Sequence, residues 1–260
     1  MIRRHYRQNK VVFGSPSSDI DPIPSNETFQ AGGTVTMVTG GLVSRVQGTS
    51  VSDPTGLGRW TGITLCGSDQ QQLTITTAYY RVCSDSIGNA PLGSSFAREY
   101  NYFHHQLAKE VVNPRRLFLR DLQSQILHFQ ESGHAVILML DANATFESDP
   151  HFEAFIDTCS LFDLHVDDPA ASTFTGAESR RIDYIFGYHH ACQYLERSGT
   201  LAYNEGPQSD HRGLYADIRL NFFSHSASPI APSSSRTIHT RNPELVERYN
   251  AKVLDYYTEH

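Results

Sequence analysis

The sequence contains no long hydrophobic run and few cysteines. No apolar stretch approaches the ~20 residues that a membrane-spanning helix needs. The basic start, Met1 to Arg4, lacks the apolar stretch of a signal peptide. The four cysteines, at positions 66, 83, 159 and 192, form no Cys-x-x-Cys pair, which argues against a zinc site or a disulfide scaffold and favours a reducing compartment. We therefore expect an intracellular protein, in the nucleus or the cytoplasm, with no membrane span.

A surplus of positive charge is also missing. The chain has 21 Lys and Arg residues against 28 Asp and Glu residues, a formal net charge of −7. This balance gives no general electrostatic reason for binding nucleic acid or an anionic membrane. It is compatible with a protein that concentrates carboxylates around a divalent cation.

The composition and length indicate one folded domain with short additions. With 260 residues, 39% of them apolar and 11% aromatic, the chain can bury a sizeable core. We expect an irregular N-terminal segment at 1–30, with a β-like piece at 11–13, and one domain at 31–220. A Ser- and Pro-rich linker at 221–240 and a C-terminal helix at 241–260 complete the predicted organisation.

The order of the predicted elements suggests a layered fold. Strands come first, followed by helices and then by further strands, which predicts an α+β or α/β domain. The two segments at 59–66 and 73–80 are predicted to pair as an antiparallel hairpin. Further strands are expected at 34–38, 136–141, 182–186 and 213–220, and helices at 95–112, 114–130 and 152–158.

A buried strand that ends on polar groups is the first candidate site. The run 136–140 is entirely apolar, as in a strand covered on both faces, and Asp141 and Asn143 follow it directly. Strand ends are where open sheets place ligand-binding groups. Asp and Asn are also common turn residues, so a simple loop cap stays as the alternative.

Two further acidic positions follow downstream. Asp183 lies inside an apolar strand, where an unpaired charge would cost several kcal/mol. An ion pair with Arg180 or Arg181 is one interpretation, although adjacent strand residues point to opposite faces. The pair Asp210 and His211 stands beside a glycine at the entrance to a strand, where it could also form a turn.

Together these groups suit phosphodiester hydrolysis. That reaction needs a hard cation held by oxygen ligands, a polarised water and charge stabilisation on the phosphoryl oxygens. A histidine that must stay oriented needs a carboxylate behind it, and Asp183 is the candidate for that role toward His211. A serine triad is disfavoured, because the sequence has no Gly-x-Ser-x-Gly elbow.

Three ordered motifs resemble a known family. LDAN at 140–143, RIDYI at 181–185 and SDH at 209–211 resemble the second half of the endonuclease/exonuclease/phosphatase superfamily. This superfamily includes abasic-site DNA endonucleases, DNase I-like nucleases, inositol polyphosphate phosphatases and sphingomyelinases. The resemblance spans roughly residues 30–220. It implies an α+β fold, a two-sheet β-sandwich with flanking helices in four DNase I-like layers.

The resemblance also implies roles for individual residues. Asp141 resembles the group that orients or deprotonates the attacking water, and Asn143 the donor to a phosphoryl oxygen. His211 resembles the phosphate-contacting histidine that Asp183 orients, and Asp210 a metal ligand. The general base stays open between Asp141 and His211.

Substrate contacts are implied less sharply. A family tyrosine that contacts phosphate corresponds best to Tyr79, but Tyr80 follows directly, and only the pairing register decides between them. Arg181 is predicted to bind substrate together with Asn143. Three other arginines (Arg115, Arg116 and Arg180) are further candidates for phosphate contacts, with surface solvation or pairing within a helix as the alternative.

The front of the chain departs from the family pattern. The family opens with two strands that end on an Asn and on a metal-binding Glu, and nothing here matches them. Glu27 follows no strand and lies too near the turn at Gly32 and Gly33, so we interpret it as a loop residue. That turn is expected to be tight, or to be a bulge where the backbone approaches a neighbour. We therefore expect a fold that lacks the first two strands, with an exposed edge and a weakened metal site.

Within the superfamily, the sequence is most similar to endonuclease domains of non-LTR retroelements. The similarity consists of the SDHRGL motif at 209–214, the Ser/Pro-rich connector at 223–236 and the RNP motif at 241–243. It implies a Mg²⁺-dependent DNA endonuclease, with Mn²⁺ as a substitute ion and the oligomeric state open. The alternatives are a phosphoesterase acting on an inositol phosphate or sphingolipid, and a catalytically impaired fragment of such a domain.

Overall fold

The computed structural model describes residues 10–14, 32–81, 94–106, 113–165, 172–175, 179–202, 205, 209–224 and 247. The chain divides into two units, Met1–Ala227 and Ser228–His260. Glu247 is the only described residue of the second unit, so the predicted C-terminal helix lies otherwise outside the described residues. No helix of the described part is long and apolar enough to cross a membrane.

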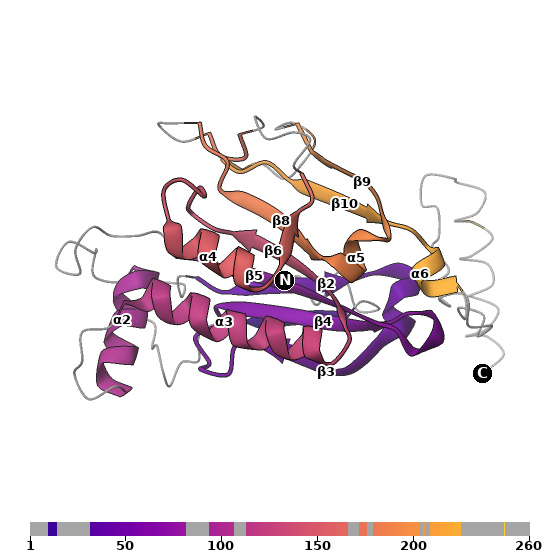
Figure 1. The fold of residues 1–260 in the computed structure, drawn as a ribbon, viewed down its shortest axis with the longest axis horizontal. Coiled ribbons are helices and arrows are strands. Elements are labelled where there is room, and N and C mark those ends of the chain that lie inside the picture. The colour runs from indigo at the N-terminus through magenta and orange to yellow at the C-terminus, as the bar shows by residue number, and fades with distance from the viewer. Residues whose placement is uncertain are drawn as a thin grey trace. The chain divides into compact units, whose positions relative to one another are not determined.

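A six-stranded sheet forms the centre of the first unit (Figure 1). Its order is β3 (Val46–Ser52), β4 (Trp60–Cys66), β5 (Gln72–Tyr79), β6 (Ala135–Asp141), β8 (Asp183–Tyr188) and β7 (Leu161–Asp163). Strands β5 and β6 are parallel, and every other neighbouring pair is antiparallel. The predicted hairpin is confirmed as β4–β5, in which Ile63 pairs with Ile75.

Two helices, α3 (Pro114–Glu131) and α4 (Pro150–Thr158), cover one face of this sheet, and α2 (Ser95–Gln106) contacts α3. Three short segments, η1 (Gly40–Arg45), α5 (His189–Cys192) and α6 (Asn221–Ser224), contribute to the core on the other face, and η2 (Ser68–Gln70) contacts α6. Helix α3 begins at Pro114 because the Asn113 side chain accepts hydrogen bonds from the amides of Arg115 and Arg116. Asp149 caps α4 in the same way.

The first core lies between α3, α4 and the sheet. Helix α3 has apolar residues at helical spacing, including Phe118 and Leu122, both fully buried. They pack on the sheet side chains of the same face, among them Trp60 and Leu138. Figure 1 shows α3 and α4 in front of the sheet. Strand β6 is apolar throughout because a second core covers its other face.

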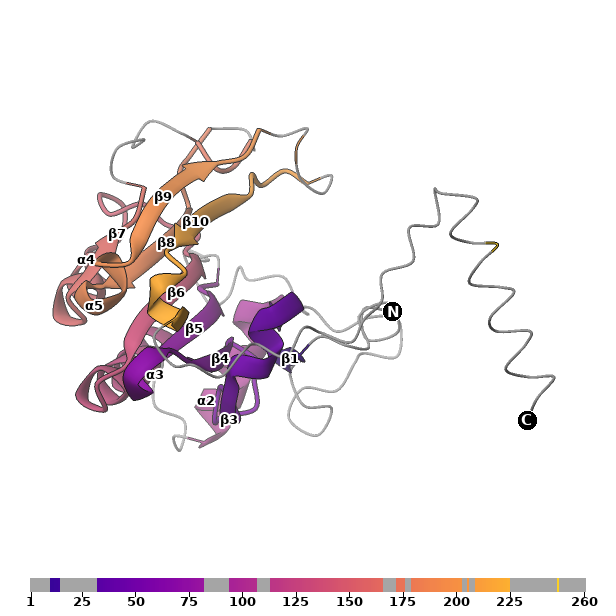
Figure 2. The ribbon, with the colours of Figure 1, turned by 90° about the vertical axis from the view of Figure 1, so that its right-hand side faces the viewer.

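The second face is covered by two separate two-stranded sheets. Strands β1 (Lys10–Gly14) and β2 (Thr34–Val38) pair antiparallel, as do β9 (Leu195–Thr200) and β10 (Leu214–Ile218). Strand β2 packs on β4 and β5, whereas β10 packs on β8. In Figure 2, β9 and β10 lie apart from β1. The second layer is thus made of two pieces that cover opposite halves of the central sheet.

A groove separates these two pieces. Its volume is about 400 Å³, and its lining includes Val35 of β2 and Leu214 of β10. The floor is formed by β5, β6 and β8, for example by Met139. Among the described residues, β2 pairs only with β1 and β10 only with β9, so each leaves one strand edge unpaired. The absence of the first two family strands stays a prediction.

The α+β class is confirmed by this mixture of one large sheet, two small sheets and flanking helices. Strand β1 coincides with the β-like piece predicted at 11–13. One boundary differs from expectation: the packed part of the domain extends beyond residue 220, because Phe222 and Phe223 of α6 are buried in the second core. The rest of the predicted linker lies outside the described residues.

A buried ion-pair network joins β4 to α3. The Arg59 side chain is fully buried, and its Nε lies 2.8 Å from Oδ2 of Asp53, which is also fully buried. Nη2 of Arg59 lies 3.0 Å from Oδ2 of Asp121 on α3. Burial alone would raise the pKa of Asp53, but the hydrogen bond and charge of Arg59 outweigh it and hold that pKa below its usual value. The network stabilises the start of β4 above the pH at which Asp53 takes up a proton.

The cysteines agree with the absence of a disulfide scaffold. Cys66, Cys159 and Cys192 are free thiols in the described part of the chain, and Cys83 lies outside it. Cys159 is fully buried at the end of α4, and burial raises the pKa of its thiol to about 12. It therefore behaves as a small apolar residue.

Candidate active site

Strand register places three predicted residues side by side. Tyr79 at the end of β5 pairs with Asp141 at the end of β6, and Asp141 pairs with Asp183 at the start of β8. Because β5 and β6 run parallel and β8 runs against them, two strand ends and one strand start meet at one edge of the sheet. All three residues line the groove between β2 and β10.

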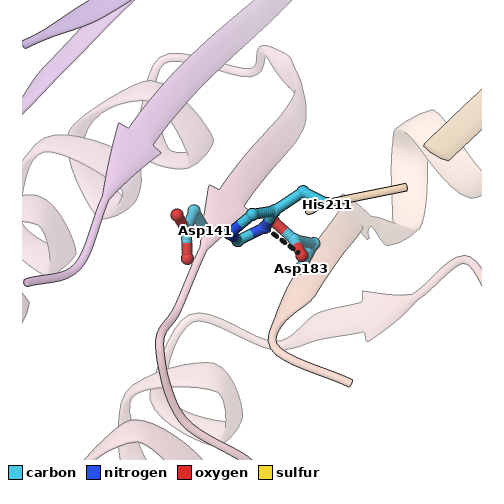
Figure 3. Close-up of side chains that lie close together, drawn as sticks. All are labelled: Asp141, Asp183 and His211. Carbon is cyan, nitrogen blue, oxygen red and sulfur yellow. Dashed lines mark hydrogen bonds and ion pairs between the residues drawn. The ribbon is translucent and has the colours of Figure 1, made fainter. Parts of the chain in front are cut away.

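His211 completes the cluster from the loop before β10. Its Nδ1 lies 2.9 Å and 3.1 Å from the two carboxylate oxygens of Asp183. Figure 3 shows the imidazole ring extending from Asp183 toward Asp141. Asp141, Asp183 and His211 each offer a ligand atom, and these atoms lie within 4.8 Å of one another. Three motifs that are distant in the sequence therefore converge on one point.

A short bridge holds the His211 loop in place. Phe174 forms β-bridges to both Arg180 and His211, and its ring centroid lies 5.0 Å from that of His211. The hydroxyl of Thr173, which is fully buried, accepts hydrogen bonds from the amides of Ile182 and Asp183. Sequence reasoning missed Thr173 and Phe174, because they precede the motif and carry no charge that would single them out.

Asn143 lies beside the cluster in a left-handed backbone conformation with φ 45°. Its amide N–H donates to Oδ1 of Asp141 at 3.2 Å, and its side-chain Nδ2 donates to the Tyr80 carbonyl at 3.0 Å. The side chain therefore ties the end of β6 to the end of β5. One N–H of the Asn143 carboxamide donates to the Tyr80 carbonyl. That the second N–H donates to a phosphoryl oxygen stays a prediction.

The register separates Tyr79 from Tyr80. Tyr79 lines the groove. Tyr80 points to the opposite face, is 1% exposed, and donates from its hydroxyl to Oδ2 of Asp149 at 2.9 Å. The structure therefore places Tyr79, and not Tyr80, beside Asp141.

Asp210 stands outside the three-residue cluster formed by the described residues. Its side chain is exposed, and its backbone carbonyl accepts a hydrogen bond from the Thr175 amide. It is near enough to His211 to contribute to raising the histidine's pKa. Its role as a metal ligand stays a prediction.

Two of the candidate phosphate-binding arginines have other partners. Arg115 is buried, pairs with Asp149 at 2.8 Å and has its Cζ 3.5 Å from the centroid of the Tyr80 ring, so surface solvation, one of the alternatives, does not apply to it. Arg181 pairs with Asp163 at 2.7 Å rather than with Asp183, and it lies over the Tyr184 ring. Arg116 and Arg180 are exposed.

The electrostatics of the cluster push its members toward different protonation states. Burial, and next the neighbouring Asp183, raise the pKa of Asp141 to about 6. Burial likewise raises the pKa of Asp183. For His211, burial alone would lower the pKa, but the hydrogen bond and charge of Asp183 outweigh it and raise that pKa. At neutral pH Asp141 is therefore an ionised base, whereas His211 holds its proton more firmly than a free histidine.

No protein-family model and no curated protein matches this sequence. Several solved structures have a similar fold. The endonuclease domain of TRAS1, a telomere-specific non-LTR retrotransposon, matches with a TM-score of 0.46 and 14% identity, over 85% of this chain and 90% of that one. The human Nocturnin catalytic domain matches with a TM-score of 0.49 and 14% identity, over 84% of this chain and 76% of that one.

A third match is the catalytic domain of APE2 from Xenopus laevis, with a TM-score of 0.42 and 18% identity. It covers 63% of this chain, which spans only 56% of the APE2 domain. At these identities the matches concern the fold alone. The ordered motifs converge at one edge of a layered α+β sheet, which is the arrangement that the resemblance of the sequence motifs implied.

Proposed function

We propose that this chain is a divalent-metal-dependent phosphodiester hydrolase, and that its substrate is DNA. The observation that carries the proposal is the cluster of Asp141, Asp183 and His211, whose ligand atoms lie within 4.8 Å of one another at the edge of a groove. Two carboxylates and an oriented imidazole are the groups that hydrolysis of a phosphodiester needs. The choice of DNA rests on the similarity of the motifs to retroelement endonucleases.

The protonation states suggest a division of labour. Asp141, with a pKa of about 6, is ionised at neutral pH and is basic enough to accept a proton from an attacking water. His211 is held by Asp183 through Nδ1, which leaves Nε2 as a donor to a phosphoryl oxygen. Asp183 fixes the ring and favours its protonated form. In this scheme Asp141 is the general base and His211 stabilises charge.

The donor set fits a hard divalent cation such as Mg²⁺ or Mn²⁺. One carboxylate oxygen each of Asp141 and Asp183 would hold the ion, which leaves the second oxygen of Asp141 to face the attacking water, and exposed Asp210 lies on the loop that carries His211. When bound, the ion would supply charge neutralisation at the phosphate.

Plasmid nicking tests this function. We expect the purified protein to nick supercoiled plasmid DNA with Mg²⁺ and not with EDTA. His211→Ala and Asp141→Asn are each expected to lower the rate about 100-fold or more, because each removes a group that takes part in proton transfer or charge stabilisation. His151→Ala, an exposed histidine at the start of α4, serves as the matched control. Nicking by both site variants at the wild-type rate would refute the proposal.

Metal binding is expected to depend on pH. Because protons compete with the cation for Asp141, the Mn²⁺ affinity should be constant above the pKa of about 6. Below that pKa it should fall about tenfold per pH unit, since one proton must leave for each ion bound. Isothermal titration calorimetry at pH 7.5, 6.5 and 5.5 measures this profile. A flat profile would place the cation away from Asp141.

One observation favours a second candidate, a catalytically impaired domain. Among the described residues no strand bridges the groove between β2 and β10, and only two carboxylates and one histidine form the cluster. The same calorimetric titration separates the two candidates. Heat of Mn²⁺ binding supports the hydrolase, whereas a folded protein that shows no binding heat and no nicking supports the impaired domain.

A further inference from the structure

A buried arginine lies directly behind Tyr79. The side chain of Arg81 is 3% exposed, and its Cζ lies 4.7 Å from the centroid of the Tyr79 ring. A guanidinium over an aromatic face is attracted by the ring's electron density, and the attraction is stronger when both groups are out of water. Because Arg81 is buried and does not line the groove, it cannot reach a substrate bound there. Any effect it has on catalysis must act through a neighbour.

Glu99 fixes the guanidinium from the helical side. It lies on α2, its side chain is 2% exposed, and its Oε1 is 2.7 Å from Nε of Arg81. Among the described residues, Nη1 of Arg81 and Oε2 of Glu99 have no hydrogen-bond partner. The pair therefore makes a single contact, through Nε, while the guanidinium carbon lies over the Tyr79 ring.

Gly32 lies against the Arg81 guanidinium, which also contacts Tyr79 and Glu99. Its φ is +88°, and a Cβ at this position would lie 2.5 Å from Nη1 of Arg81. This contact is the close backbone approach that the Gly32-Gly33 pair predicted. Glycine is needed here for its backbone conformation and also because any side chain would displace the guanidinium.

We propose that Glu99 and Arg81 are positioning residues that hold the Tyr79 ring in the groove beside Asp141. This inference rests on the proposed function. It adds a chain of side-chain contacts that runs from α2 to Tyr79 at the end of β5. Glu99 bonds Arg81, the Arg81 guanidinium lies over the Tyr79 ring, and Tyr79 lies opposite Asp141 in the sheet. The ring is thereby kept in one orientation before substrate arrives, which lowers the cost of reaching the productive geometry.

An alternative role for Arg81 is purely electrostatic. Its charge is one of the smaller influences on Asp141, where it lowers the pKa. Lysine separates the two roles, because it keeps the positive charge but has no planar face to stack on a ring. If stacking is what matters, Arg81→Lys behaves like Arg81→Ala. If charge is what matters, Arg81→Lys restores the wild-type rate and overturns the proposal.

Steady-state nicking kinetics on a short DNA substrate give the first measurement. We expect Arg81→Lys and Arg81→Ala each to lower kcat about tenfold and to change KM less than about twofold, since positioning is lost while substrate contacts remain. Glu99→Gln should give a smaller loss of kcat, because glutamine still accepts the hydrogen bond from Nε. Arg197→Ala, at an arginine whose side chain is 73% exposed, is the control and should match the wild type.

A double-mutant cycle identifies the route through Tyr79. In a Tyr79→Phe background, where the hydroxyl is absent, Arg81→Lys should lower kcat less than about twofold, because coupled residues do not act additively. Full additivity would show that Arg81 acts by another route and would overturn the proposal. Circular dichroism of each variant identifies any that fail to fold.

A readout without catalysis keeps this inference separate from the proposed function. With ¹³C-labelled tyrosine, NMR should show the Tyr79 ring signals shifting in Arg81→Lys, while those of Tyr80 stay in place. If the wild type does not nick DNA but the Tyr79 signals shift, the proposed function fails and the positioning contact stands. If the wild type nicks DNA and the Tyr79 signals do not shift, the positioning role is refuted.

Discussion

Replacing Asp141 by asparagine is expected to abolish nicking and at the same time to stabilise the protein at neutral pH. The carboxylate of Asp141 is mostly buried and lies opposite another carboxylate, and its pKa is raised from 3.8 to about 6. The folded state therefore opposes ionisation of this group. Asparagine has nearly the same shape, can still accept the hydrogen bond from the Asn143 amide, and carries no charge.

The size of this gain follows from linkage. A carboxyl group whose folded pKa lies above its unfolded value destabilises the fold at high pH, and the penalty grows as pH rises from about 4 to about 6. A rise of the pKa from 3.8 to about 6 corresponds to about 2 to 3 kcal/mol. For a domain of this size we expect a Tm increase of about 4 to 12 °C at pH 7 in EDTA.

Thermal unfolding at two pH values checks this prediction. At pH 4 the increase in Tm should largely vanish, since Asp141 is then protonated in the folded wild-type protein as well. Asp157→Asn, at an exposed position on α4, is the control and should leave the Tm unchanged at both pH values. A lower Tm for Asp141→Asn at pH 7, or an equal gain at pH 4 and pH 7, would contradict the electrostatic interpretation of the site.

Removing Asp53 is expected to have the largest effect on stability. Arg59 is fully buried, and Asp53→Ala would leave its guanidinium with Asp121 as its remaining ion-pair partner among the described residues. Loss of one partner of a buried pair typically costs about 3 to 5 kcal/mol. Because a whole domain is stabilised by only about 5 to 15 kcal/mol, this substitution should unfold a large part of the protein at 37 °C.

Urea denaturation followed by tryptophan fluorescence measures this loss, since Trp60 lies beside Arg59. The double variant Asp53→Leu/Arg59→Met should recover most of the stability, because it removes both charges together. Asp217→Ala breaks the exposed pair with Arg197 and should leave the urea midpoint unchanged. A midpoint for Asp53→Ala close to that of the wild type would show that Asp121 alone satisfies Arg59.

Much of the site follows from local sequence, and the rest depends on contacts between distant segments. Asp141, Asp183 and His211 each occur in a motif whose residue types fit phosphate chemistry, so their convergence could be predicted without coordinates. The choice between Tyr79 and Tyr80 depends on strand register, which two adjacent tyrosines cannot reveal. Arg81 and Glu99 carried no signal, because a loop and a helix bring them together and no motif contains both.

The arginines also show that contacts between distant segments cannot be predicted from local sequence. Arg115 and Arg181 carry the charge that a phosphate-binding residue needs, yet each has a carboxylate partner elsewhere in the fold. The sequence shows that a positively charged side chain is present, but it does not show whether a carboxylate elsewhere in the fold already pairs with that side chain. The outline of the fold was easier to predict, because apolar periodicity in α3 and continuous apolar character in β6 both report directly on burial.

Strands β5 and β6, the single parallel pair of the central sheet, are joined by a long connection on which the site depends. The connection between β5 and β6 contains α2 and α3 and returns the chain across the sheet. Tyr79 and Asp141 become neighbours only when this long connection has closed. His211 enters from the far end of the same unit. During synthesis the polypeptide must leave the ribosome almost to the end of this unit before its candidate catalytic groups can meet. Proteolytic cleavage between β5 and β6 would leave only noncovalent contacts to hold Tyr79 beside Asp141.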